Sequence, residues 1–149
     1  MRRTEVTMTS AETQIRALLD SRSAAMGDKD IEWVMSLYSP DIVYFDLVPP
    51  LQYAGSSALR ERFSDWFGRW TGPIGQELGD LKVIAGDTVA AAWMLIRASG
   101  TLKTGQDVDY WVRVSNGFQR SGDSWFITHE HVSLPVNMQT RTAVMDLAP

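Results

Sequence analysis

The 149-residue sequence contains no cysteine, which excludes disulfide frameworks, thiolate nucleophiles and zinc–thiolate sites. Long apolar runs are missing as well, since no segment approaches the roughly 18 consecutive apolar residues that cross a membrane. The opening MRRTEVTMTS also lacks the apolar core of a signal peptide. These absences favour a cytoplasmic protein that has no membrane partner.

Positive charge is scarce and scattered along the chain. There are 14 Lys and Arg residues against 18 Asp and Glu residues, the formal net charge is −4, and no basic run extends beyond Arg2-Arg3. Sequence-independent nucleic-acid binding depends on clustered cations that displace counterions from phosphates. We therefore expect no nucleic-acid partner.

The residues that are present have the composition of one globular domain. Hydrophobic residues make up 44% of the chain and charged residues 21%, and 149 residues are enough to bury a sizeable core. We expect a flexible N-terminal segment over residues 1–10 and a single domain over residues 11–149.

Helical spacing of apolar residues predicts three helices in the first half of the chain. The first runs from the capping sequence Thr9-Ser10-Ala11-Glu12 to Gly27. The second begins at residues 28–30 and continues until Pro40 stops it, so it should contain Tyr38. Short strands follow over residues 41–46 and 53–55. A third helix over residues 56–69 then carries a broad apolar stripe: Leu59, Phe63, Trp66, Phe67 and Trp70.

The second half of the chain predicts four long strands, over residues 76–85, 88–99, 106–118 and 125–134. Each strand leads directly into the next, so the pairing should be antiparallel. Helices first and a meander later predict an α+β fold in which helices cover one face of a curved sheet. A sheet capped in this way encloses a cavity, and that cavity is the candidate site. The sequence does not define the structure of the tail, residues 136–149.

The last hairpin holds both histidines of the chain, in the triplet His129-Glu130-His131. Because side chains alternate along a strand, the histidines share one face and Glu130 points to the other. The two histidines could share a metal with a nearby carboxylate, or belong to a packed or dimer-facing surface. Two registers remain open. In one, Trp125, Ile127, His129, His131 and Ser133 face outward while Phe126, Thr128, Glu130 and Val132 line the cavity; in the other, the two sets exchange places.

Alternation also sorts the two preceding strands, where Trp93 shares a face with Arg97, and Asp109 with Arg113. An arginine that faces an aspartate forms a charge-assisted pair, which either ties neighbouring strands together or holds an anionic ligand. Aromatic residues at these spacings pack a core by default, and a cavity lining is a special case of core packing. The candidate ligand-binding residues are Tyr44, Trp66, Trp93, Arg97, Asp109, Arg113 and Glu130.

Three segments carry a resemblance to a known family: YSPDIVYFD, DLKVIAGD and the final W-x-I-T-H-E-H-V-S-L-P. Together with the order of the predicted elements, they resemble the SnoaL-like, ketosteroid-isomerase-related branch of the nuclear-transport-factor-2-like superfamily, over about residues 11–134. The resemblance implies a cone of three N-terminal helices on a curved, mostly antiparallel sheet, with no metal and no cofactor. The superfamily contains isomerases, polyketide cyclases, hydrolases, dehydratases, and modules for binding or assembly.

The segment YSPDIVYFD resembles the isomerase segment around the catalytic base and places Asp46 at the position of that base. The alternative is that Asp46 ends a strand and bonds the turn that follows. The isomerase also uses a tyrosine and a protonated aspartic acid to stabilise an oxyanion. Arg22 falls at the position that resembles the tyrosine, and Asp109 is the nearest carboxylate for the second donor. A guanidinium is not a phenol, and this departure from the isomerase argues against steroid isomerisation.

Three functions remain open at this point. The first is a cofactor-independent enzyme with Asp46 or His129 as general base and Arg97, Arg113 or Arg22 stabilising negative charge. The second is a non-catalytic protein that binds a small apolar or anionic organic ligand in the same cavity. The third is an assembly module, a homodimer formed through the long sheet with the histidine face at its interface. The first two functions are compatible with a homodimer, and a homodimer with a ligand-binding cavity is our prediction.

Overall fold

The computed structural model describes residues 10–149 and confirms the predicted α+β fold. Its elements are α1 (Ser10–Gly27), α2 (Ile31–Ser36), β1 (Tyr38–Phe45), β2 (Tyr53–Ala54), α3 (Ser56–Gly68), β3 (Trp70–Ala85), β4 (Val89–Leu102), β5 (Asp107–Ser121), β6 (Ser124–Ser133), β7 (Val136–Asn137) and β8 (Thr142–Ala143). The flexible segment predicted for residues 1–10 lies outside the described residues, except that Ser10 is the first residue of α1. No helix in residues 10–149 is long and apolar enough to cross a membrane.

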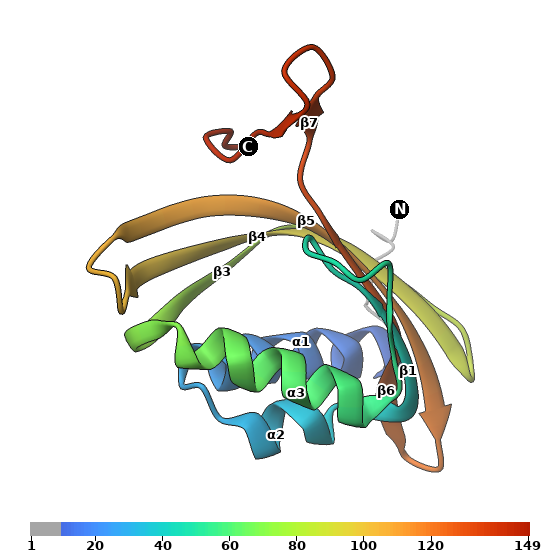
Figure 1. Cartoon of the computed structure of the whole chain (residues 1–149). Coiled ribbons are helices and arrows are strands. Elements are labelled where there is room, and N and C mark those ends of the chain that lie inside the picture. The colour runs from blue at the N-terminus through green and yellow to red at the C-terminus, as the bar shows by residue number, and fades with distance from the viewer. Residues whose placement is uncertain (1–9) are drawn as a thin grey trace, which may run out of the picture.

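The six-stranded sheet has the order β2-β1-β6-β5-β4-β3 and is strongly curved, with the three helices lying against its concave side (Figure 1). All neighbouring strands pair antiparallel except β1 and β6, which run parallel. The core fills the space between helices and sheet and includes Ile15 and Leu19 from α1, Phe63 from α3, and Ile96 from β4.

The tail after β6 forms a small hairpin of β7 and β8 that projects from the rest of the molecule (Figure 1). Its turn is fastened by Asn137, whose side-chain oxygen accepts hydrogen bonds from the backbone N–H groups of Gln139 and Thr140. This order within residues 136–149 was not apparent from the sequence.

The second helix is shorter than predicted, because it ends at Ser36, and Tyr38 begins β1 instead. Asp30 caps the helix by accepting a hydrogen bond from the backbone N–H of Trp33. Pro40 therefore lies inside a strand, at a point where the β1–β6 register shifts between Tyr38 and Val43. A strand tolerates proline at such an irregularity because no regular ladder hydrogen bond is lost there.

Trp70, which the helical stripe was predicted to include, is instead the first residue of β3. Residues 71–73 lie within this strand, where the register with β4 shifts between Thr71 and Gly75. The glycine and proline there interrupt the ladder without ending the strand.

A β-bulge in β6 decides which side chains face the core. Phe118 of β5 pairs with Ile127 and Gly117 pairs with His129, so Thr128 is an extra residue on β6. The extra residue reverses the alternation halfway along the strand. The buried residues of β6 are accordingly Trp125 and Ile127 before the bulge, and Glu130 and Val132 after it. Each of the two predicted registers is therefore wrong over half of the strand.

Deleting Thr128 should abolish the cooperative unfolding transition. Without the extra residue, β6 must turn outward either Trp125 and Ile127 or Glu130 and Val132, and each apolar side chain exposed costs about 1.5–3 kcal/mol. The control Thr128→Ala keeps the bulge and loses only the hydrogen bond from the Thr128 hydroxyl to the Gly117 carbonyl, at 3.3 Å; it should cost about 1 kcal/mol. Equal denaturant midpoints for the two variants would show that the bulge does not determine the register.

Candidate functional site

A cavity of about 470 Å³ lies between the helices and the concave face of the sheet. Its walls are mostly apolar, with Phe63 and Trp66 from α3 on one side and Ile96, Val112 and Val114 from β4 and β5 on the other. Leu47 and Val48 after β1 and Ala143 and Met145 in the C-terminal tail also border it. Ligand sites in proteins commonly have this size and this apolar character.

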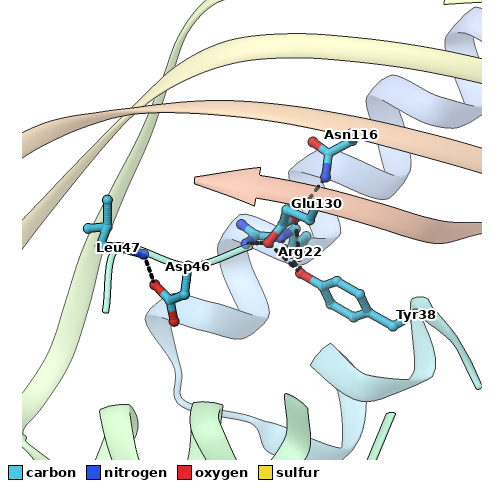
Figure 2. Close-up of polar contacts among 6 residues, drawn as sticks. All are labelled: Arg22, Tyr38, Asp46, Leu47, Asn116 and Glu130. Atoms are coloured by element: carbon cyan, nitrogen blue, oxygen red, sulfur yellow. Dashed lines mark hydrogen bonds and ion pairs between the residues drawn. The ribbon is translucent and has the colours of Figure 1, made fainter. Parts of the chain in front are cut away.

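A buried polar network joins α1 to the sheet beside this cavity (Figure 2). Arg22 donates from Nε to the Tyr38 hydroxyl and from Nη2 to Glu130 Oε2, each at 2.8 Å. Glu130 Oε1 also accepts from Asn116 Nδ2 at 2.7 Å, and the Tyr38 hydroxyl lies 3.1 Å from both Glu130 oxygens. Glu130 is fully buried and Arg22 is 5% exposed, so the pair is an internal salt bridge.

The local structure explains why these four residues meet. Arg22 lies on the core-facing side of α1, seven residues after Ile15 and three after Leu19, both of which are buried. Asn116 takes an inward position in β5, and the bulge at Thr128 turns Glu130 inward opposite it. Tyr38 reaches the same place because β1 lies beside β6.

Burial alone would lower the pKa of Arg22, but the Glu130 carboxylate and the hydroxyl of Tyr38 outweigh it and hold that pKa above its ordinary value. Burial, with a further contribution from Glu130, raises the pKa of Tyr38 well above its usual range despite the neighbouring Arg22. Arg22 therefore stays a cation and Tyr38 stays a protonated phenol at physiological pH.

Asp46 forms a second polar site at the edge of the cavity, to one side of the Arg22 network (Figure 2). Its Oδ2 accepts a hydrogen bond from Arg62 Nε at 2.7 Å, and its Oδ1 accepts one from the backbone N–H of Leu47 at 2.6 Å. The side chain is 8% exposed. Tyr110 lies nearby, and burial, reinforced by the Asp46 carboxylate, raises the pKa of its phenol.

The structure brings three of the predicted site residues, Tyr44, Asp46 and Trp66, together around the cavity. Arg22, which the sequence offered as a candidate for stabilising negative charge, lines the same cavity. Glu130 lies behind Arg22 and does not line the cavity. Its four hydrogen bonds, to Arg22, Tyr38 (two) and Asn116, are all internal.

The remaining predicted site residues lie on the convex face of the sheet, so the prediction that they share the cavity is wrong. The inward positions of β4 belong to Met94, Ile96 and Ala98, which turns Trp93 and Arg97 outward. Arg97 is bonded to Asp109 and Glu77, and Arg113 donates to the Ser133 hydroxyl. The sequence left open whether these arginines link neighbouring strands or bind an anionic ligand. In the structure they link neighbouring strands.

His129 is also on the convex face, where it cannot serve as a general base for a molecule in the cavity. Its Nδ1 lies 2.7 Å from the carbonyl oxygen of Val43, and Phe45 packs edge-on against both histidine rings. Within residues 10–149, no three His, Asp or Glu side chains are grouped so that they could hold a metal ion. A homodimer through this face stays a prediction.

Sequence reasoning missed Asn116 and Arg62 as parts of the site. Asn116 interrupts the inward apolar series Val112, Val114 and Phe118, and a polar residue at such a position was a usable signal. Arg62 precedes Trp66 by one helical turn on α3, on the side that faces the cavity.

Comparison with known proteins agrees with this architecture. The model of the SnoaL-like domain matches residues 15–137. The chain belongs to the SnoaL-like family. No functionally curated protein matches the sequence.

Several solved structures of nuclear-transport-factor-2-like and ketosteroid-isomerase-like proteins share the fold of this SnoaL-like chain. A nuclear-transport-factor-2-like protein of unknown function from Pseudomonas putida KT2440 is 35% identical, with 95% of this chain and 99% of that chain covered and a TM-score of 0.87. A ketosteroid-isomerase-like protein from Erwinia carotovora atroseptica is 20% identical, with coverages of 85% and 97% and a TM-score of 0.73. A nuclear-transport-factor-2-like superfamily protein from Salmonella enterica is 17% identical, with coverages of 87% and 94% and a TM-score of 0.75. The last two show a shared fold only.

Replacing Glu130 by glutamine should destabilise the protein by about 3–5 kcal/mol, because it leaves the Arg22 cation buried without a counter-charge. The matched control is Asp109→Asn, which breaks the solvent-exposed pair with Arg97. That change should hardly move the midpoint of chemical denaturation, because water screens exposed charges. Chemical denaturation of both variants measures the difference, and similar midpoints would contradict the internal salt bridge.

Proposed function

We propose that this SnoaL-like protein binds a small, largely apolar organic molecule in the cavity between the helices and the sheet. The observation that carries the proposal is the cavity itself, about 470 Å³ with apolar walls and only a few polar groups. A well-packed protein interior leaves few voids larger than a water molecule, so a space of this size calls for an occupant. A ketosteroid-isomerase-like protein shares the fold of this chain, and this supports small-molecule binding as its role.

Filling the cavity should abolish binding of an uncharged apolar fluorescent probe such as N-phenyl-1-naphthylamine. Ala98 lines the cavity from β4, so Ala98→Phe places a ring in the space that the probe would take. The control Ala91→Phe adds the same ring to the same strand on its exposed convex face. We expect at least about a tenfold loss of affinity for the first variant and little change for the second. Equal binding by both would place the probe outside the cavity and contradict the proposal.

Proton transfer by Asp46 is a second candidate function, supported by the position of this carboxylate at the cavity. Its two oxygens already accept hydrogen bonds from Arg62 and Leu47, and a transferred proton would compete with these donors. Binding without catalysis therefore accounts for the geometry more simply.

Solvent deuterium exchange at the α-carbon of an enolisable ketone, followed by NMR, tests the second candidate. If Asp46 is the base, Asp46→Asn should slow the exchange about 10²–10⁴-fold. Asp65→Asn is the matched control, because Asp65 is the other carboxylate near Arg62 and is largely exposed. Full exchange by Asp46→Asn, or no exchange above the background rate in the unmodified protein, would rule out this role.

A further inference from the structure

We infer that Arg22 is the specificity-determining residue of the cavity, and that it selects uncharged apolar molecules bearing an oxygen acceptor, such as a carbonyl group. The inference rests on the proposed function, because it names the chemical class of the ligand that the cavity binds. The buried network leaves one part of the Arg22 side chain without a hydrogen-bond partner within residues 10–149.

Arg22 has a free hydrogen-bonding edge. Its Nε and Nη2 donate to Tyr38 and Glu130, whereas Nη1 has no partner among the described residues. Nη1 is not one of the buried polar atoms that lack a hydrogen-bond partner, so this unpaired atom keeps some accessible surface. Because Arg22 is only 5% exposed and lines the cavity, we take the free Nη1 edge to face the cavity. A guanidinium N–H is a donor only, so its ligand partner must be an acceptor.

The network holds this donor in place before any ligand arrives. Nε and Nη2 fix the plane of the guanidinium, and Glu130 is itself fixed by Asn116 and the Tyr38 hydroxyl. An arginine held in this way loses little rotamer freedom when it binds an acceptor. A hydrogen bond from a charged donor in an apolar surrounding is also stronger than a neutral one.

The charges around the cavity explain why the acceptor should be uncharged. Arg22 is neutralised by Glu130, and Arg62 is neutralised by Asp46. Arg69 also borders the cavity, but its side chain is 69% exposed and it is paired with Asp65. An anionic ligand would therefore enter an apolar space without a compensating positive charge, and it would lose its hydration. A carbonyl oxygen gains the hydrogen bond without that cost. Of the two ligand classes that the sequence allowed, apolar and anionic, the structure favours the uncharged one.

Three probes of nearly the same shape test the inference directly. They are 2-acetylnaphthalene, 2-isopropenylnaphthalene, in which a CH₂ group replaces the carbonyl oxygen, and 2-naphthoate, in which an anionic oxygen replaces the methyl group. We expect the ketone to bind about tenfold more tightly than the alkene, because a hydrogen bond to a charged group has roughly this value. We also expect the ketone to bind more tightly than the carboxylate. Isothermal titration or quenching of tryptophan fluorescence measures all three affinities.

A double variant, Arg22→Met with Glu130→Gln, identifies the residue responsible. It removes both buried charges together, so neither is left without its partner. The ratio of ketone to alkene affinity should fall to about one. The matched control is Arg97→Met with Glu77→Gln, which removes an ion pair from the convex face, and its ratio should equal that of the unmodified protein. A ratio of about ten that survives the Arg22 double variant would overturn the inference.

The outcomes separate the inference from the proposed function. If the alkene binds but the ketone binds no more tightly, the inference fails and cavity binding stands. If the carboxylate binds most tightly, the cavity selects anions and the inference is likewise wrong. If none of the three binds, the proposed function fails, and the inference falls with it. The affinities of the unmodified protein decide these cases even if the double variant does not fold.

Discussion

The internal salt bridge between Arg22 and Glu130 is the interaction on which the rest of the structure depends. It joins α1 to β6 across 108 positions of sequence, and it lies where helix, sheet and cavity meet. Burying two ions is costly unless they are paired and hydrogen-bonded. Here Tyr38 and Asn116 complete the bonding of Glu130, and Tyr38 also accepts a hydrogen bond from Arg22 Nε. The bulge at Thr128, the entry of β1 beside β6 and the position of α1 all serve that requirement.

A salt bridge of this kind is a poor means of gaining stability, since well-packed apolar side chains often do as well or better. Its position beside a cavity suggests a different role, which is to hold Arg22 in place at the binding site. The carboxylate of Glu130 is fully hydrogen-bonded within the network and holds Arg22 in place. Arg22 keeps its Nη1 group free for a ligand in the cavity, as we infer above. Together with the Asp46–Arg62 pair, this produces an apolar space that offers donors but little net charge.

The sequence predicted the α+β class, the curved antiparallel meander and the resemblance to the SnoaL-like family, because these depend on patterns that extend over many residues. It failed where one residue changes the pattern. The extra residue Thr128 reverses the alternation of β6, and no local signal marks it. Pro40 is a typical stop signal for a helix, yet it lies at an irregularity inside β1. Trp93, Arg97, Asp109 and Arg113 were assigned to the cavity because alternation shows which residues share a face but not which face is inside.

A crystal structure of the protein with 2-acetylnaphthalene would show directly whether Arg22 binds the ligand in the cavity. We expect the naphthalene rings between α3 and the concave face of β4 and β5, with the carbonyl oxygen at about 2.7–3.2 Å from Nη1 of Arg22. A ligand on the convex face, or one whose oxygen points to Arg62 and away from Arg22, would contradict this expectation.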